Sequence, residues 1–522
     1  MTRPMNGAEA LIHTLVDSGV DVCFTNPGTS EMHFVAALDE VPEMRAILGL
    51  FEGVVTGAAD GYARMTGRPA ATLLHLGPGL GNGLANLHNA RRAHSPMVNI
   101  VGDHATYHKK FDAPLESDID AIASAVSGWY HRSMSPDRVA ADTARAVAAA
   151  LTPPGQVATL VLPADTCWSP APGGPSPAIA PPDHEPVEGP DIEQLARLLK
   201  SKEKCTILLG GRALTAAGIR AANQIAETTG SNLLCETFPA RLERGGGLPE
   251  VSRVIYLAEF AQMQLDGSRH LILVDAVEPV SFFAYPDKAS VLTPDDCETH
   301  TLAAGVHDPE AALTELAEAL GTSQPAASQP ASRPDRPTGA LDLNSFAAAI
   351  AVTLPEHAIV VDEAITSGIS IPGATAGGPR HDWLCLTGGA IGMGLPLAVG
   401  ASVACPDRRV LSIEADGSAM YTIQSLWTMA RENLDITVVI ANNGRYAVLD
   451  MELDRVGATA SGTAARSMFD LGNPDLDFVS MATSMGVEAV RAETAEDLTG
   501  HLERCHREPG PHLIEATLPT GG

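Results

Sequence analysis

The sequence is poor in basic residues, in aromatic residues and in long apolar runs. Its 522 residues include 34 Lys and Arg against 63 Asp and Glu, which gives a formal net charge of −29. Phosphate backbones and anionic membrane surfaces both bind through Lys and Arg patches, so we expect neither nucleic acid nor a membrane as a partner. No run approaches the roughly 18 apolar residues of a membrane span, and no signal-peptide pattern opens the chain.

Cysteine pairs are also missing. The eight cysteines are scattered and include no Cys-x-x-Cys pair. In a chain of this size, scattered cysteines are typical of reduced, buried thiols rather than of a disulfide framework. We therefore expect a cytoplasmic protein.

What the sequence does contain is three blocks in which short apolar runs alternate with helical periodicity. A Pro- and Gly-rich linker at 168–190 and a Ser-, Gln- and Pro-rich linker at 322–340 separate the blocks. The predicted domains are therefore 1–167, 191–321 and 341–522. Strands that alternate with helices are typical of parallel sheets covered on both faces, so the predicted fold class is α/β, with three doubly wound domains.

The predicted strands are the short apolar runs of each block. They cover residues 22–25, 47–50, 71–75, 97–101 and 157–162, then 205–209, 232–235 and 270–275, then 358–361, 383–386, 410–413, 436–441 and 512–516. The Ala- and Gly-rich stretch at 58–63 is predicted to be a helix that packs closely on a neighbour.

The most informative stretch is residues 414–446. Asp416, Gly417 and Ser418 follow one buried strand, and Asn443 follows the next. Ligands of open α/β sheets lie at the carboxyl ends of strands, so Asp416 and Asn443 should face the same crevice. Their oxygens suit a hard cation such as Mg²⁺, and the helix start at Gly417 and Ser418 can donate hydrogen bonds to a diphosphate.

Each half of this stretch has a simpler interpretation by itself, as a helix cap and as a turn. Together they resemble the thiamine diphosphate (ThDP) binding motif, Gly-Asp-Gly followed by Asn-Asn, with Ala415 where that family usually has Gly. The three α/β blocks also resemble ThDP enzymes of the acetolactate synthase and benzoylformate decarboxylase group, so the resemblance covers essentially the whole chain. The pattern is most similar to acetolactate synthase-like proteins of actinobacteria.

The resemblance implies ThDP and Mg²⁺ as cofactors. It assigns the metal to Asp416, Asn443 and the backbone carbonyl of Arg445. It also places Tyr446 and Thr366 among the cofactor contacts, together with the two residues of the helix start. FAD, which some acetolactate synthases bind, is not indicated, because the turn at 208–212 has no obvious acidic ribose ligand.

The resemblance also indicates which residues contact the rings of the cofactor. Glu52 would bond to the aminopyrimidine and help the cofactor to lose the proton that makes it a nucleophile. The carbonyl of Gly389 would accept a hydrogen bond from the cofactor's 4′-amine, and Ile391 would hold the cofactor in its bent shape. From the residues alone, Glu52 is equally well a carboxylate at a helix start, and Ile391 an ordinary core residue.

Two further residues are candidates for contact with the substrate. His75 matches the histidine that transfers protons in benzoylformate decarboxylase-like enzymes. Thr29 falls where those enzymes have a Ser that contacts the substrate carboxylate. The simpler interpretations are a scaffold histidine and a helix cap. His104 and His108 could supply a second proton carrier or an anion contact.

Two departures separate the chain from both groups of enzymes. The decarboxylases carry a second histidine from the central domain, and Phe283, in the stretch 280–285, matches its position in the resemblance. The acetolactate synthases carry a Phe-Gln-Glu stretch, in which Leu115 here replaces the Gln. Neither activity therefore transfers directly from the resemblance.

We predict a ThDP- and Mg²⁺-dependent enzyme that acts on a 2-oxo acid, as a homodimer or homotetramer with active sites at the subunit interface. Carboligation to a second carbonyl, as in acetolactate synthases, is the favoured outcome, because Phe282, Phe283 and Leu115 suggest a dry pocket. Simple decarboxylation is the alternative, and His75 favours it. A ThDP-binding homologue with little catalysis is the third interpretation.

Overall fold

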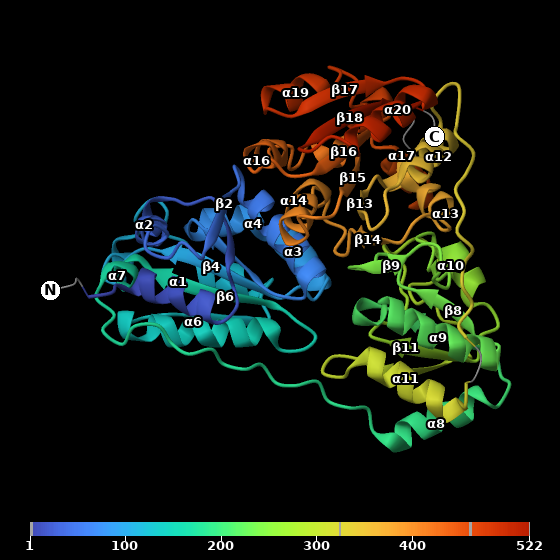
Figure 1. The fold of residues 1–522 in the computed structure, drawn as a ribbon, viewed down its shortest axis with the longest axis horizontal. Coiled ribbons are helices and arrows are strands. Elements are labelled where there is room, and N and C mark those ends of the chain that lie inside the picture. The colour runs from blue at the N-terminus through green and yellow to red at the C-terminus, as the bar shows by residue number, and fades with distance from the viewer. Residues whose placement is uncertain (1–3, 323–324, 459–461, 521–522) are drawn as a thin grey trace.

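The computed structural model describes residues 4–322, 325–458 and 462–520 of the chain. These residues form three β-sheets with helices packed against them (Figure 1). The N-terminal and C-terminal domains meet near the middle of the view, where helices α3 and α14 lie in contact. Among the described residues, no helix is long and apolar enough to cross a membrane.

The first sheet has six parallel strands in the order β2-β1-β3-β4-β6-β5. Helices α1 and α6 cover one face and α3 and α4 the other, each over its own apolar core, so the sheet is doubly wound. The strands are β1 (Val22–Thr25), β2 (Arg45–Leu48), β3 (Ala70–Leu74), β4 (Met97–Asp103), β5 (Trp129–Arg132) and β6 (Val157–Pro163). The helices are α1 (Gly7–Asp17), η1 (Thr29–Glu31), α2 (Met32–Ala37), α3 (Glu52–Thr66), α4 (Leu76–Arg92), η2 (Lys109–Phe111), α5 (Ile119–Ser124), α6 (Pro136–Leu151) and α7 (Ala164–Trp168).

The second sheet has five parallel strands in the order β10-β8-β7-β11-β12. Its strands are β7 (Cys205–Leu209), β8 (Asn232–Cys235), β10 (Ser252–Arg253), β11 (His270–Val274) and β12 (Glu298–Ala303). Helices α8 (Gly189–Leu199), α9 (Ala216–Thr229) and α11 (Pro309–Leu320) pack on one face, and α10 (Ala258–Leu265) packs on the other. The short helix η3 (Gly211–Ala213) follows β7.

The third sheet has seven strands in the order β17-β18-β16-β15-β13-β14-β9. Its strands are β13 (Ile359–Glu363), β14 (His381–Cys385), β15 (Val410–Ala415), β16 (Ile436–Asn442), β17 (Glu488–Ala492), β18 (His512–Thr517) and the antiparallel β9 (Leu242–Arg244). Its helices are α12 (Leu343–Thr353), η4 (Ile365–Gly368), α13 (Ile371–Ala374), α14 (Gly394–Ala404), α15 (Asp416–Ala419), α16 (Ser425–Arg431), α17 (Ala447–Arg455), α18 (Thr463–Arg466), η5 (Ser467–Phe469), α19 (Phe478–Ser484) and α20 (Ala495–Cys505). β9 comes from the segment between β8 and β10. The central part of the chain therefore contributes one strand to the third sheet.

Close packing of α3 on α14 joins the N-terminal domain to the C-terminal domain. A side chain at Gly61 would clash with the backbone of Leu397, and one at Gly400 would clash with the backbone of Ala58. Glycine at these two positions lets the helices approach each other closely. The predicted close packing of the Ala- and Gly-rich helix is therefore confirmed.

The chain passes from β3 almost directly into a helix, and the segment around Thr29 differs from expectation. Helix α4 begins at Leu76, directly after His75, so the Gly-Pro-Gly run forms its first turn. Thr29 does not cap a helix, because it lies inside η1, which follows Gly28. Its side chain is exposed at the carboxyl end of the first sheet and is free to meet a ligand.

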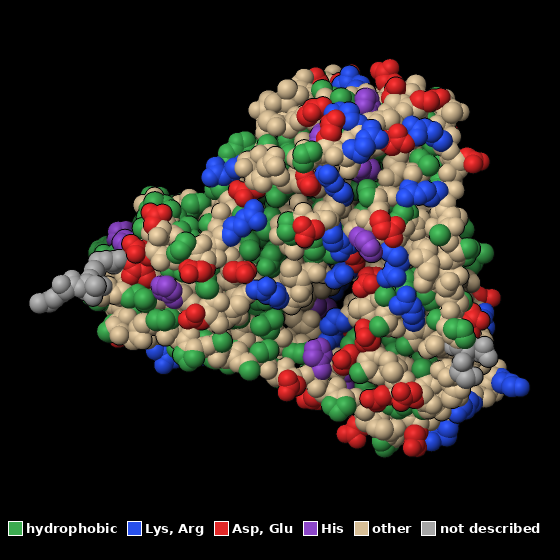
Figure 2. Space-filling view, viewed as in Figure 1, with side chains coloured by type: hydrophobic (Ala, Val, Ile, Leu, Met, Phe, Trp, Pro, Cys, Tyr) green, Lys and Arg blue, Asp and Glu red, His purple; other side chains and the backbone are tan. Residues whose placement is uncertain are grey.

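The face in Figure 2 is hollowed where the domains meet, and Lys, Arg and His side chains lie beside the hollow. Elsewhere on this face, acidic and basic side chains are interspersed, and green apolar side chains lie between them. The excess of acidic residues is therefore not gathered into one patch on the side that is seen.

Candidate active site

The loops after β15 and β16 lie side by side, because the two strands are parallel neighbours. Asp416 follows β15 and is only 2% exposed. Its Oδ1 accepts from the N–H of Gly417 at 2.7 Å, and its Oδ2 accepts from the N–H of Gly444 at 2.8 Å. Asn443 Oδ1 accepts from Arg445 N–H at 3.0 Å. The structure thus brings Asp416 and Asn443 to one edge of the sheet.

The surroundings of Asp416 suit a bound cation. Burial raises the pKa of this carboxyl, and among the described residues no Lys or Arg forms an ion pair with it. The carbonyl oxygen of Arg445 accepts one hydrogen bond, from Ala447 N–H at 3.0 Å, and so keeps a second lone pair. Carboxylate, amide and carbonyl oxygens are the ligands that Mg²⁺ takes. The residues fit a divalent cation, and their role as its ligands stays a prediction.

The predicted phosphate contacts surround the same loop. Gly417 and Ser418 lie buried in the first turn of α15. A side chain at Gly417 would clash with the ring of Tyr446, so only glycine lets this ring lie against the turn. Thr366 lies in η4, just beyond the carboxyl end of β13. These four residues stay predicted cofactor contacts.

The loop between β14 and α14 carries the other predicted cofactor residues. Gly389 has a φ of +74°, in the left-handed region that favours glycine. The ring of Phe282 lies against it, so a side chain at this position would also clash. The ring next to Gly389 is that of Phe282, and the match of Phe283 to the decarboxylases' second histidine stays a prediction. Ile391 packs against the apolar core beneath the loop.

Two buried glutamates support this loop from below. Glu363, at the end of β13, accepts from the N–H groups of Gly392 at 2.7 Å and Gly394 at 2.5 Å. Burial raises the pKa of Glu363 to about 7, and burial beside Glu363 raises the pKa of Glu414 well above its ordinary value. Two carboxyls so close cannot both ionise readily, so we expect them to share a proton at neutral pH.

Glu52 lies in the N-terminal domain, at the first position of α3. It is 7% exposed, and its Oε2 accepts from the side-chain amide of Asn82 at 2.9 Å. Its Oε1 faces Gly79, where an added Cβ would lie 3.0 Å away. Both neighbours belong to α4, so the packing of α3 against α4 fixes the direction of the Glu52 carboxylate.

His75 forms a pair with Glu31, a residue that the sequence reasoning did not single out. His75 Nδ1 lies 2.8 Å from Glu31 Oε2, which also accepts from Gly28 N–H at 2.8 Å. A side chain at Gly28 would clash with the imidazole. Glu31 is 3% exposed, and burial raises the pKa of its carboxyl, an effect that His75 opposes. Glu31 therefore occupies one ring nitrogen, and Nε2 is the nitrogen left for the predicted proton transfer.

We expect Glu31→Gln to lower kcat by about 10- to 100-fold, because an orienting carboxylate contributes part of the 10²–10⁴ that a placed acid or base supplies. The glutamine keeps the size of the side chain and loses its charge. The measurement is steady-state kinetics with saturating ThDP, beside the exposed control variant Glu40→Gln. An unchanged kcat in Glu31→Gln would show that the pair only holds the fold.

Helix α4 joins the N-terminal half of the site to the Gly389 loop within one chain. Asn86 Nδ2 donates to the carbonyls of Gly53 at 2.8 Å and Gly392 at 3.2 Å. Asn89 Nδ2 donates to the carbonyl of Ala390 at 2.8 Å. Among the described residues, however, no hydrogen bond or ion pair joins the Glu52 side chain to either the Gly389 loop or the Asp416 loop.

The remaining predicted contacts lie at the rim of the N-terminal domain. The rings of His104 and His108 are 5.5 Å apart, and burial lowers the pKa of His104. The Nε2 of His104 is buried without a partner among the described residues. Leu115 is exposed in the single chain.

The Gly-rich turn after β7 binds the protein's own carboxylates. Gly211 N–H donates to Glu236 Oε1 and Arg212 N–H donates to Asp275 Oδ2, each at 2.9 Å. A diphosphate at this turn would have to displace both carboxylates. This contact pattern agrees with the expectation that FAD is not indicated, which stays a prediction.

Glu236 predicts a pH dependence of stability. Burial raises the pKa of Glu236 from 4.5 to about 7, because it disfavours the charged carboxylate. The contribution of this residue to the free energy of unfolding is therefore complete below about pH 4.5 and is lost as the pH rises through about 7. The loss amounts to roughly 3 kcal/mol at most. We expect Glu236→Gln to reduce the fall in Tm over this range, measured by calorimetry. The exposed variant Glu227→Gln is the control, and equal pH profiles for all three proteins would contradict the prediction.

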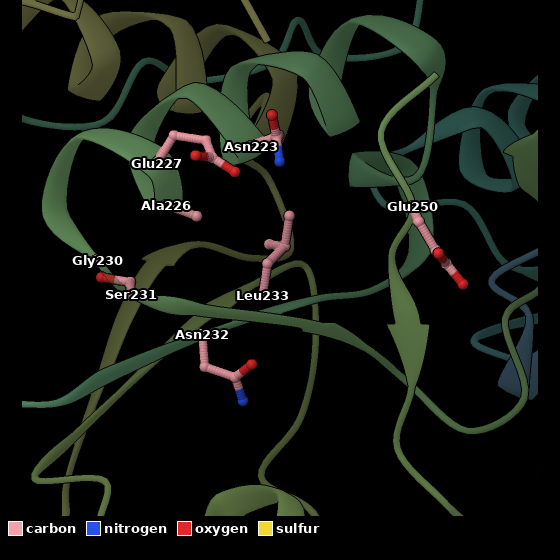
Figure 3. Close-up of a pocket in the computed structure, with 8 residues that line it drawn as sticks. All are labelled: Asn223, Ala226, Glu227, Gly230, Ser231, Asn232, Leu233 and Glu250. Atoms are coloured by element: carbon pink, nitrogen blue, oxygen red, sulfur yellow. The ribbon is translucent and has the colours of Figure 1, made fainter. Parts of the chain in front are cut away.

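A separate pocket of about 340 Å³ lies on the central domain (Figure 3). It is lined by Asn223, Ala226, Glu227, Gly230, Ser231, Asn232, Leu233 and Glu250. It is formed by α9, the start of β8 and the segment before β10. None of the predicted site residues lines it. The candidate active site therefore consists of strand-end loops of the other two domains, not of this pocket.

Comparison with known families identifies the class of protein that has this fold and these loops. The thiamine pyrophosphate enzyme N-terminal TPP binding domain matches residues 5–124, and the C-terminal TPP binding domain matches residues 371–516. Thiamine pyrophosphate is another name for ThDP. The chain belongs to the ThDP-dependent enzymes, so the predicted resemblance and fold class are confirmed.

Individual relatives cover nearly the whole chain. The Mycobacterium tuberculosis protein named "Putative acetolactate synthase large subunit IlvX" is 58% identical over 519 residues, which are 99% of each chain. Benzoylformate decarboxylase of Pseudomonas aeruginosa is 29% identical over 534 residues, 96% of this chain and 97% of that one. The structure of the Rhodococcus jostii RHA1 ThDP-dependent 4-hydroxybenzoylformate decarboxylase has a TM-score of 0.87 at 24% identity, covering 99% of this chain and 100% of that one, and shows the shared fold.

Proposed function

We propose that the protein is a ThDP- and Mg²⁺-dependent enzyme that decarboxylates a 2-oxo acid and joins the remaining acyl unit to a second carbonyl. The M. tuberculosis relative bears the name of an acetolactate synthase, a carboligating enzyme. The cytoplasm as location, and a homodimer or homotetramer with shared active sites, belong to the same proposal.

In this proposal the strand-end loops of the C-terminal domain hold the diphosphate end of the cofactor. Asp416, Asn443 and the carbonyl of Arg445 bind Mg²⁺, while Ser418 and Thr366 face the phosphates. The bound cofactor supplies the electron sink for the loss of CO₂. Glu52 holds a proton against the pyrimidine ring.

The observation that carries carboligation is an aromatic cluster beside Gly389. Phe282 contacts this glycine, and the rings of Phe238, Tyr256 and Phe283 lie 5.9, 5.3 and 5.1 Å from that of Phe282. The decarboxylases of the family have a histidine in this region. The faces of these rings offer the reacting carbon no proton, so an acceptor carbonyl competes better beside them.

Simple decarboxylation is the second candidate, and the His75–Glu31 pair favours it. A histidine whose other nitrogen is fixed by a buried carboxylate is a suitable proton donor. It would protonate the acyl unit and release an aldehyde. Protonation and carboligation therefore compete at the same carbon, and the outcome depends on which group lies nearer.

Product identification distinguishes the two candidates. The holoenzyme, with ThDP and Mg²⁺, is incubated with a panel of 2-oxo acids, each with and without an added aldehyde or second 2-oxo acid. Mass spectrometry should find a 2-hydroxy ketone or 2-hydroxy-3-oxo acid as the main product. Release of CO₂ and free aldehyde in equal amounts, without a new C–C bond, would overturn carboligation and establish the decarboxylase.

A further inference from the structure

Three side chains converge at the beginning of strands β11 and β12 in the central domain. His270 Nδ1 lies 3.1 Å from His300 Nε2. Glu298 Oε2 lies 3.9 Å from each of these two nitrogens. Two imidazole nitrogens and one carboxylate oxygen thus surround a single point.

The pairing of the strands produces this convergence. β11 and β12 are parallel, with His270 opposite Glu298 and Ile272 opposite His300. Residues two apart in a strand project from the same face of the sheet, so all three polar side chains lie together. The cluster depends on the register of the sheet and not on a flexible loop.

A fourth residue determines which ring nitrogen of His270 is protonated. Glu203 Oε2 lies 3.0 Å from His270 Nε2, so this nitrogen carries the hydrogen that the carboxylate accepts. In the neutral imidazole, Nδ1 then presents a bare lone pair toward His300. Metal-binding histidines commonly donate their other N–H to a carboxylate in this way.

The charges around the cluster leave room for a cation. Among the described residues, neither Glu203 nor Glu298 forms an ion pair with Lys or Arg; their ion pairs are with histidine.

A second cluster, Glu488, Glu508 and His512, has similar spacing. There Arg504 Nη1 already lies 2.6 Å from Glu488 Oε1 and 2.8 Å from Glu508 Oε2. In the described part of the chain, the β11–β12 cluster has no Lys or Arg in this position.

We propose that His270, His300 and Glu298 form a binding site for a transition-metal ion of the Zn²⁺ type, with Glu203 orienting His270. Zn²⁺ binds imidazole at about 2.0–2.1 Å, so nitrogens 3.1 Å apart can reach one ion. The exposed Glu298 side chain is free to move the short distance toward it. Water would complete a tetrahedral shell.

Such an ion would tie the edge strand β12 to its inner neighbour β11. The cluster lies at the amino ends of these strands, in a different domain from both Asp416 and Glu52. The metal would therefore stabilise the central domain without entering the chemistry of the ThDP site.

The test is Zn²⁺ binding to the full-length protein by calorimetry, with ThDP and excess Mg²⁺ present to fill the cofactor site. The wild type should bind one Zn²⁺ that His300→Asn does not bind. Glu298→Gln, which alters an exposed side chain, should weaken binding at least 10-fold. Glu203→Gln should weaken it by about 10- to 100-fold, as loss of a supporting carboxylate does.

Two control variants should retain the site. Glu508→Gln alters the other cluster, and Cys297→Ser removes a neighbouring thiol that packs on the opposite face of the sheet. Both should bind Zn²⁺ as the wild type does, and Zn²⁺ should raise the Tm of all proteins that keep the site.

Three results would overturn the proposal: no Zn²⁺ binding by the wild type, equal affinity in Glu298→Gln and the wild type, or loss of binding in Cys297→Ser alone. Equal affinity in Glu298→Gln would mean that Glu298 is not a ligand, so the three residues would not form one site.

Discussion

Glu52→Gln is expected to lower kcat about 100-fold or more, within the range that a placed proton carrier contributes. Glu52 is nearly buried, and its Oε2 is held by the amide of Asn82, so the substitution keeps the shape and removes only the ability to hold a proton. ThDP binding should change little, because in the proposed site the diphosphate end is held by residues of the other domain. The measurement is kcat beside the dissociation constant for ThDP.

The exposed variant Glu43→Gln serves as the matched control and should keep the kcat of the wild type. Melting curves of both variants verify the fold. If Glu52→Gln kept more than half of the wild-type kcat while folded, Glu52 would not carry the proton. Its position at the start of α3 would then be explained by the helix dipole alone.

Inner strands of the three sheets could be predicted from the sequence, because they are continuous apolar runs. All five strands that the sequence did not predict lie at sheet edges: β5, β9, β10, β12 and β17. Edge strands have one partner and are partly solvated, so they carry polar residues, as in the Glu-Thr-His-Thr of β12. β9 is also hard to predict because its partner strand, β14, lies far away in the sequence.

Part of the candidate site could be predicted because its residues form recognisable local patterns, such as Asp416-Gly417-Ser418. Glu31 and Glu363 were missed because their partners come from other segments. Glu31 follows β1 and contacts His75, which follows the neighbouring strand β3. Glu363 accepts a hydrogen bond from a backbone amide of the loop before α14. Glu31 ends the Asn-Pro-Gly-Thr-Ser-Glu run as its only acid, which was a usable signal. The sequence around Glu363 contains no comparable signal.

Asp416→Asn is expected to weaken ThDP and Mg²⁺ binding at least 10-fold, the usual effect of altering a metal site, and to abolish activity at ordinary cofactor concentration. The amide removes the negative charge. It also sets an NH₂ group against the N–H of Gly444 or of Gly417, where the carboxylate now accepts from both. Calorimetry with ThDP and Mg²⁺ measures the loss. The exposed variant Asp454→Asn should bind as the wild type does, and unchanged affinity in Asp416→Asn would remove this residue from the metal site.

The two inactive variants together test whether the site is shared between subunits. If Glu52 of one chain meets the cofactor held by Asp416 of another, chains carrying Glu52→Gln and chains carrying Asp416→Asn can assemble intact sites. Random pairing in a two-fold symmetric dimer would restore about one quarter of the wild-type activity, because half of the dimers are mixed and one of their two sites is intact. A site built within one chain would give no recovery. The absence of any bond from Glu52 to the Asp416 loop within the described chain leads us to expect recovery, measured after co-expression of the two variants with different affinity tags.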